Sequence, residues 1–362
     1  PSLAGSQYAA AGSDSSVAAG RVSFCLGLQG PCSTTNTACA SALSALHVAM
    51  HTVRAAECGR ATVLAIGLKL VPHITLVVAA AGMLSTEGRC KTFDARANGY
   101  ACGEGSGAVV VERRAGGGGG REEQTAGGIL RGCLGRQDGR SASLTAPNGR
   151  AQSTLLRVVL AASGLKPEAL DLLEAHGTGT KLGDPTEAGG LAAVHGTAGR
   201  ESPLAVSGGK ANYAHSEGGA GLDGMLKVYV ALSGNVSLGN AQLRQANTIV
   251  SKVLTSHGLT CAANLPTQGA ALTRVRAVAV SCFGWSGIIA NALVARPEVV
   301  ASRPVEAPAL LAYRQNAFPW RDVTSSAGSA RTLMYSSCWA PAPPASTSPP
   351  MTRLLMTTPS LF

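Results

Sequence analysis

Aromatic residues are scarce in this chain of 362 residues: they make up only 4% of it, whereas glycine contributes 45 residues. So few aromatic rings argue against an aromatic-rich β sandwich. They favour a layered α/β protein in which small side chains pack closely. Hydrophobic residues still make up 45% of the sequence. The chain is therefore long and apolar enough for one large domain or two domains of ordinary size.

Several common motifs are missing. None of the ten cysteines forms a C-x-x-C pair, which argues against a zinc site, and no metal is expected. No uncharged apolar run reaches 18 residues, so no membrane-spanning helix is expected. The opening residues, Pro1–Ala4, are not a signal peptide and lack a starting methionine. We expect a reducing compartment, either the cytoplasm or a plastid, and a natural N-terminus further upstream.

The formal net charge is +10, but lysine and arginine are scattered along the chain. Without a basic run or interleaved aromatic residues, a nucleic-acid partner is not expected. Two interpretations of the charge stay open. The surface is basic without a special role, or its field attracts an acidic protein partner.

Hydrophobic periodicity predicts helices and strands in alternation, which is typical of a layered α/β fold. The glycine run 116–120 predicts a flexible connection between two halves, and the Pro/Ser-rich stretch 340–350 predicts a linker or tail. The predicted helices cover residues 38–58, 153–163, 185–194 and 219–232. The predicted strands cover residues 61–70, 107–112, 170–174, 204–207, 275–281 and 288–295.

Cys39 lies where a Ser/Thr-rich stretch runs into the first predicted helix. A helix N-terminus carries about half a positive charge, which lowers the pKa of a thiol and favours the nucleophilic thiolate. Backbone N–H groups at the same place can hold a developing oxyanion. The alternative is an inert buried thiol, as expected for most of the other cysteines.

Two histidines follow in the second half. His176 comes directly after a predicted strand and before a loop that contains Thr178 and Thr180, whose hydroxyls can bind an amide-bearing arm. His215 lies between Lys210 and Glu217, just before an apolar helix, in a cluster able to titrate. A structural role for either histidine stays open on these segments alone.

Taken in order, these segments resemble the ketosynthase (β-ketoacyl synthase) domain of type I polyketide synthases, in the thiolase-like superfamily. The similarity covers roughly residues 15–296. Besides the two histidine segments, the matching motifs are residues 36–47, 88–95 continuing to 99–105, 144–149 and 281–287. The chain differs from the usual motif at Asn36, Asn98 and Cys102, and in residues 288–291.

The resemblance implies a layered α/β/α/β/α fold of two related halves. Residues 1–296 would form the ketosynthase domain, with 1–115 as the remainder of an incomplete N-terminal half and 121–296 as the C-terminal half. Residues 297–362 would be a post-ketosynthase linker and tail, because 313–322 resemble such a linker. Other polyketide synthase domains would then follow in the natural protein.

The resemblance also implies catalytic roles. Cys39 would be the nucleophile that accepts the acyl group, and His176 and His215 would be the paired histidines. Lys210 would organise this cluster. Phe283 would act as a gate and lend its backbone N–H to an oxyanion hole beside that of Cys39.

Further implications concern substrates and partners. Thr178 and Thr180 would contact the phosphopantetheine arm of an acyl carrier protein, and no cofactor would be bound by the domain itself. The chain would act as a homodimer and catalyse decarboxylative condensation in polyketide or fatty acid synthesis. A non-catalytic scaffold or chain-length partner is the alternative. A thiolase and a cysteine protease fit the motifs less well.

Overall fold

The computed structural model describes residues 8–114, 128–196, 200, 202–272, 274–296 and 351–356. All of them belong to one compact unit of the chain. The predicted glycine-rich connection at 116–120 lies outside the described residues, and so does the predicted linker from 297 onward apart from 351–356.

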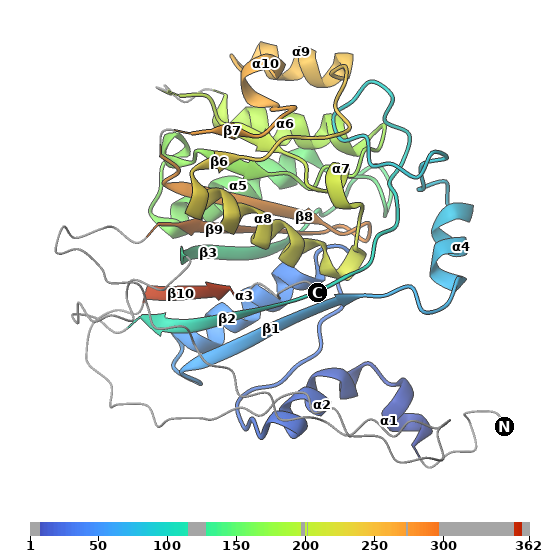
Figure 1. Ribbon diagram of the computed structural model, residues 1–362, viewed down its shortest axis with the longest axis vertical. Helices are drawn as coiled ribbons and strands as arrows, with labels where there is room; N and C mark the ends of the chain where they lie inside the picture. Colours follow the sequence, from blue (N-terminus) through green and yellow to red (C-terminus); the bar gives the residue numbers. More distant parts are fainter. Residues whose placement is uncertain are drawn as a thin grey trace, which may run out of the picture. The chain divides into compact units, whose positions relative to one another are not determined.

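Helices and strands alternate along this unit (Figure 1). The helices are α1 (Ala9–Ser13), α2 (Ser16–Leu26), α3 (Ser41–Arg54), α4 (His73–Ala80), α5 (Gly149–Ser163), α6 (Gly183–His195), α7 (Lys210–Tyr213), α8 (Ala220–Gly234), α9 (Thr248–Ser256) and α10 (Cys261–Asn264). The strands are β1 (Arg60–Gly67), β2 (Gly105–Arg114), β3 (Gly128–Gln137), β4 (Leu172–Glu174), β5 (Ala205–Ser207), β6 (Val236–Ser237), β7 (Ala270–Ala271), β8 (Ala277–Phe283), β9 (Ile288–Ala295) and β10 (Met351–Met356).

Eight strands form one mixed sheet in the order β1-β2-β10-β3-β9-β8-β4-β5. Strand β4 runs parallel to both β5 and β8, whereas the other neighbours are antiparallel. Strand β10 pairs with β2 on one side and with β3 on the other, so it joins the strands of the two halves. β6 and β7 form a separate two-stranded ribbon.

Helices α3 and α8 form an inner layer. α3 contacts β1 and β2 as well as β3 and β9, and α8 contacts β2 as well as β8. One hydrophobic cluster accordingly contains Leu43 of α3, Met225 of α8, Val63 of β1 and Val280 of β8. Burying such side chains supplies most of the driving force for this packing. Helices α5 and α6 pack together in a second cluster against the other side of β9, which contributes Leu293.

The predicted α/β fold is confirmed. In the described residues, strands β3 and β9 of the mixed sheet lie between the inner helix α3 and the outer helix α5, and α8 and α6 belong to the corresponding hydrophobic clusters. The outward side chains Leu64 and Ile66 of β1 are 43% and 62% exposed, so no helix covers this side of β1 in the described residues.

The predicted elements occur with shifted ends. The first helix is shorter than expected and begins at Ser41, because Ala38 has a positive φ of 51° that a helix does not allow. Strand β3 was not predicted from the sequence. Its glycines and arginines conceal the hydrophobic pattern, although it lies in the middle of the sheet.

Candidate active site

The turn before α3 positions Cys39. Ala38 adopts a left-handed conformation, and its N–H donates to Oδ1 of Asn36 at 3.1 Å. The hydroxyl of Ser41 accepts from the N–H of Thr37 at 2.8 Å and donates to the carbonyl of Ala38 at 2.7 Å. A strained residue next to a nucleophile persists only where its surroundings hold it. Here those bonds fix the thiol between the loop and the helix.

The turn after β8 covers the thiol. A Cβ atom on Gly284 would lie 2.6 Å from the carbonyl oxygen of Thr37, so only glycine permits this close approach. The approach brings the backbone N–H of Trp285 into hydrogen-bond contact with Cys39. The thiol residue is 9% exposed. Thr37 and Gly284, which are 247 positions apart in sequence, therefore enclose the candidate nucleophile.

His215 is held with one ring nitrogen toward the sulfur. Its Nε2 lies 3.1 Å from Sγ of Cys39, and its Nδ1 accepts the backbone N–H of Glu217 at 3.1 Å. In a neutral imidazole one nitrogen donates and the other accepts. Because Nδ1 accepts, Nε2 carries the proton and points it at Cys39.

The strand-like segment 101–103 supports His215 from the side. The His215 N–H donates to the carbonyl of Ala101 at 2.9 Å, and the N–H of Gly103 donates to the His215 carbonyl at 2.8 Å. The ring of Tyr100 lies edge-on to that of His215, with centroids 5.1 Å apart. The matched motif at residues 99–105 thus fixes both the backbone and the ring of His215.

His176 follows β4. Its backbone N–H and that of Gly177 donate to the two carboxylate oxygens of Glu187 at 2.7 and 2.8 Å. The His176 ring lies 5.7 Å from that of His215 and 5.4 Å from that of Phe283, centroid to centroid. Its buried Nδ1 has no hydrogen-bond partner among the described residues. The predicted pairing of the two histidines is therefore present in the geometry.

The loop after His176 carries the two predicted threonines. Their hydroxyl oxygens lie 3.3 Å apart, and that of Thr180 accepts the N–H of Gly183 at 3.1 Å. Asp184 at the start of α6 accepts the N–H groups of Gly179 and Phe93 at 3.0 and 2.6 Å. Two buried carboxylates, Asp184 and Glu187, therefore shape the loop. Neither carboxylate has a role predicted from the sequence.

Phe283 ends β8. In an antiparallel pair, alternate residues turn their N–H groups toward and away from the neighbour strand. Gly284 bonds to Ile288 across the β8–β9 pair, so the Phe283 N–H points away from β9 and toward the side of β4. β4 pairs with β8 only as far as Val280, so it does not use this N–H. The N–H expected in the oxyanion hole is thus directed toward the His176 loop.

Burial dominates the electrostatics of the site. It raises the pKa of Cys39 to about 11, although the nearby charge of Lys210 acts in the opposite direction. The expectation that a helix N-terminus lowers this pKa is wrong, because removing the thiolate from water costs more than the helix end and Lys210 return. Burial also lowers the pKa values of His176 and His215 well below the usual range, helped by Lys210. The resting site thus contains a thiol and two neutral imidazoles at pH 7.

Lys210 is itself buried at the start of α7, which places its charge close to all three groups. A second buried cation lies behind the site. Nζ of Lys227 is 2.8 Å from Glu174, the last residue of β4, whose other oxygen accepts the N–H of Gly209. Such a buried pair is costly to break, because removal of one partner leaves an unpaired charge. Glu174 therefore links β4, which carries His176, to the turn that carries Lys210.

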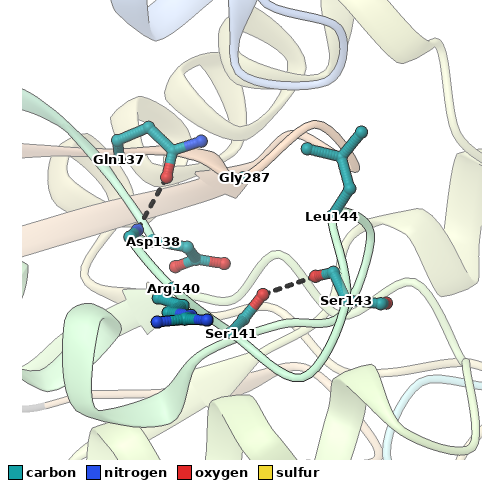
Figure 2. Close-up of a pocket in the computed structure, with 8 residues that line it drawn as sticks. Gln137, Asp138, Arg140, Ser141, Ser143, Leu144 and Gly287 are labelled. Atoms are coloured by element: carbon teal, nitrogen blue, oxygen red, sulfur yellow. Dashed lines mark hydrogen bonds between the residues drawn. The ribbon is translucent and has the colours of Figure 1, made fainter.

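The loop 144–149, one of the motifs matched by sequence, borders a hollow of about 300 Å³ (Figure 2). Gln137 lines it and accepts the N–H of Gly139 at 2.7 Å, and Ser141 donates to the carbonyl of Ser143 at 2.5 Å. Gly287, from the turn that covers Cys39, also lines it. None of the three candidate catalytic residues belongs to this hollow.

Two protein-family models match the chain. Residues 2–116 match the model of the β-ketoacyl synthase N-terminal domain, and residues 128–243 match that of the C-terminal domain. The chain belongs to the β-ketoacyl synthase family. More narrowly, its relatives identify it as a ketosynthase domain like those of type I polyketide synthases. Such domains form a class of condensing acyltransferases.

Two curated relatives illustrate the similarity. A phenolphthiocerol synthesis polyketide synthase of Mycobacterium bovis is 37% identical over 303 residues, which is 83% of this chain and 14% of that protein. An erythronolide synthase of Saccharopolyspora erythraea is 39% identical over 225 residues, covering 62% of this chain and 6% of that protein. Both relatives are bacterial, so they lend no support to a plastid location.

Solved structures show the same fold. The ketosynthase from module 6 of the bacillaene synthase of Bacillus subtilis is 30% identical with a TM-score of 0.71, over 80% of this chain and 52% of that one. An oxazolomycin ketosynthase domain of Streptomyces albus gives 30% identity and a TM-score of 0.72, over 86% and 52%. The chain thus spans about half the length of these ketosynthases, and a small part of the curated synthases.

In the described part of the chain, no group of three histidine, cysteine or acidic side chains is arranged to hold a metal ion. None of the described helices has the length and hydropathy that a bilayer span requires.

The buried acids of the His176 loop predict a pH effect on stability. Burial raises the pKa of Asp184 to about 6, so the folded chain keeps this proton up to a pH at which the unfolded chain, with a pKa near 3.8, has lost it. Stability contributed by this group is therefore present below about pH 4 and falls as pH rises to about 6.

Asp184→Asn removes this titration. Between pH 4 and 6 the free energy of unfolding of the wild type should fall, relative to that of the variant, by up to about 3 kcal/mol. Chemical denaturation at several pH values measures this difference. The exposed Glu57→Gln serves as a control for loss of a carboxylate. Parallel pH curves for wild type and Asp184→Asn would contradict the prediction.

Proposed function

We propose that this chain catalyses decarboxylative Claisen condensation, with Cys39 as nucleophile and His176 and His215 as hydrogen-bond donors. The observation that carries the proposal is the 3.1 Å contact between His215 Nε2 and Cys39 Sγ, with the ring of His176 next to that of His215. A buried thiol beside two neutral imidazoles is suited to forming a thioester and then binding an enolate oxygen.

In the first step, the sulfur of Cys39 attacks the carbonyl carbon of an acyl thioester. The bond from that carbon to the carrier sulfur breaks, and the proton of the Cys39 thiol ends on the leaving thiol. The N–H groups of Cys39 and Phe283 stabilise the tetrahedral oxyanion. His215 Nε2–H stabilises the sulfur as its negative charge develops, which offsets part of the cost of burial.

In the second step, a malonyl-type thioester loses CO₂, and the electron pair of the broken bond becomes an enolate. His176 and His215 donate hydrogen bonds to the enolate oxygen. A neutral donor suits this task, because it needs no net charge in a buried site. In the third step, the enolate carbon attacks the Cys39 thioester, the carbon–sulfur bond breaks, and the released thiolate takes up one proton from solvent.

The arm that carries both substrates is phosphopantetheine on an acyl carrier protein. Its amides would bind the hydroxyls of Thr178 and Thr180, since Thr178 and Thr180 line the loop directly after His176. Lys210 would keep both imidazoles neutral through its positive charge. The domain would need no cofactor of its own. The proposal also includes that the chain forms a homodimer, that other synthase domains act beside it, and that it lies in the cytoplasm.

The domain division proposed here is a ketosynthase domain over 1–296 followed by a linker over 297–362. The two family models together run from residue 2 to residue 243, and β8 and β9 extend the same sheet to Ala295. The non-catalytic scaffold has no observation in its favour, because Cys39 is present and contacts His215.

The nucleophile can be identified by mapping its adduct. Incubation with a mass-tagged acyl thioester should place the tag on Cys39, and Cys39→Ala should abolish labelling because no other thiol lies against an imidazole donor in the described site. Cys58→Ala is the matched control, because Cys58 is a half-buried thiol outside the proposed site. In this variant Cys39 should be labelled as in the wild type. A tag on another cysteine, with Cys39 unmodified, refutes the assignment.

The two histidines should matter more for decarboxylation than for loading. His176→Ala or His215→Ala should slow malonyl decarboxylation by about 100-fold or more, the usual cost of losing one oxyanion donor. Acyl loading should fall less, because the backbone donors remain. His257→Ala at the end of α9 is the control. Decarboxylation at the wild-type rate in either variant would rule out this role.

The net charge of +10 predicts a salt effect on carrier binding, because carrier proteins are typically acidic. Affinity should fall as salt rises, since the Debye length shrinks from about 10 Å at 0.1 M to about 3 Å at 1 M. Sedimentation with and without carrier protein, at both salt concentrations, measures affinity and dimerisation together. A chain that sediments as a monomer, with the same affinity for the carrier protein at both salt concentrations, would contradict the expected dimer and the expected salt effect.

A further inference from the structure

The segment after β1 approaches the His215 loop very closely. A Cβ atom on Gly67, the last residue of β1, would lie 2.0 Å from the carbonyl oxygen of Ser216, so only glycine fits there. A Cβ atom on Gly218 would lie 3.5 Å from the carbonyl oxygen of Ile66, which is an ordinary van der Waals contact across the same interface. The residues after His215 therefore pack directly against the end of β1.

An ion pair crosses this contact. Nζ of Lys69 lies 2.9 Å from Oε2 of Glu217, and the two side chains are 14% and 23% exposed. The Lys69 backbone is fixed as well, because its N–H donates to the carboxylate of Glu104. A pair so shielded from water is screened less by salt than an exposed one.

Three features of Glu217 indicate that its side chain must be held in place. It adopts a positive φ of 54°, a strained conformation for this residue type. In that conformation its N–H donates to Nδ1 of His215, the bond that leaves the proton on Nε2. The other carboxylate oxygen, Oε1, is buried without a hydrogen-bond partner among the described residues. Lys69 is therefore the cation that holds this side chain.

We propose that Lys69 is a positioning residue for the active site, acting on His215 and Cys39 through Glu217. By holding the Glu217 side chain against β1, it keeps the Glu217 N–H directed at His215 Nδ1. By neutralising the Glu217 carboxylate, it limits the repulsion between that charge and the Cys39 thiolate. This inference rests on the function proposed above, but its electrostatic part can be measured without any turnover.

The charges around the thiol define the expected signs. Lys210 and Lys69 are cations near the site, Lys227 is paired with Glu174 behind it, and Glu217 is an anion near the thiol, while the Glu104 carboxylate accepts the Lys69 N–H. His176, His215 and Tyr100 are neutral neighbours. Glu217 raises the pKa of Cys39, after burial and against Lys210. Removing Lys69 leaves the Glu217 charge uncompensated, whereas removing the Glu217 charge leaves Lys69 unopposed.

The test is alkylation of Cys39 by iodoacetamide in the full chain, followed as a function of pH and mapped by mass spectrometry. Lys69→Met should slow alkylation at a fixed pH by about threefold to tenfold, as expected for one partly buried charge pair. Glu217→Gln should accelerate it. Lys69→Arg should match the wild type, and Lys69→Met combined with Glu217→Gln should return close to the wild-type rate.

Arg60→Met is the matched control, because Arg60 lies at the other end of β1 and pairs with Glu112 far along the strand from Lys69. It should leave the alkylation profile unchanged. The opposite signs for Lys69→Met and Glu217→Gln separate an electrostatic effect from misfolding, which would not accelerate a site-specific reaction in one variant and slow it in the other. A Lys69→Met profile equal to the wild type, or a double variant as slow as Lys69→Met, overturns the proposal. Failure of the chain to condense substrates, with these alkylation shifts present, would count against the proposed function alone.

Discussion

The contact between His215 Nε2 and Cys39 Sγ is the interaction on which the rest of this site depends. It exists because the Glu217 N–H occupies Nδ1, which leaves the ring proton on the nitrogen that faces the sulfur. Residues 101–103 hold the His215 backbone, and the turn at Gly284 closes over the thiol. Each of these supports comes from a different part of the chain, so the contact forms only when the fold is complete.

Burial sets the chemistry of the site. The same loss of water raises the pKa of the Cys39 thiol and lowers those of His176 and His215, so the resting groups are neutral. In the proposed reaction, charge develops only when the sulfur attacks or the enolate forms. Donors that are already in place then act in a medium where a hydrogen bond is electrostatically strong. Lys210 and the buried pair of Glu174 and Lys227 supply the fixed charges around this site.

The sequence predicted the alternation of helices and strands well, because hydrophobic periodicity reflects which side of an element is buried. It failed where local conformation overrides the pattern. The helix predicted over 38–58 begins only at Ser41, after the left-handed Ala38, and ends before the left-handed Ala56. Strand β3 was not predicted because its small and charged residues give no clear hydrophobic pattern. The fold accepts them there because α3 and α5 pack on this strand.

By itself, the sequence determined the family and singled out Cys39, His176 and His215 as the proposed catalytic residues, because these motifs have a fixed order and spacing along the chain. It also indicated the roles of Thr178, Thr180, Phe283 and Lys210 through the resemblance. Only the tertiary structure decided the state of these groups: the raised pKa of the thiol, the tautomer of His215, the contact of Glu187 with His176 and the ion pair of Lys69 with Glu217. The reason is physical. Desolvation and hydrogen bonding depend on neighbours that folding brings from distant segments, and no local pattern records which neighbours those will be.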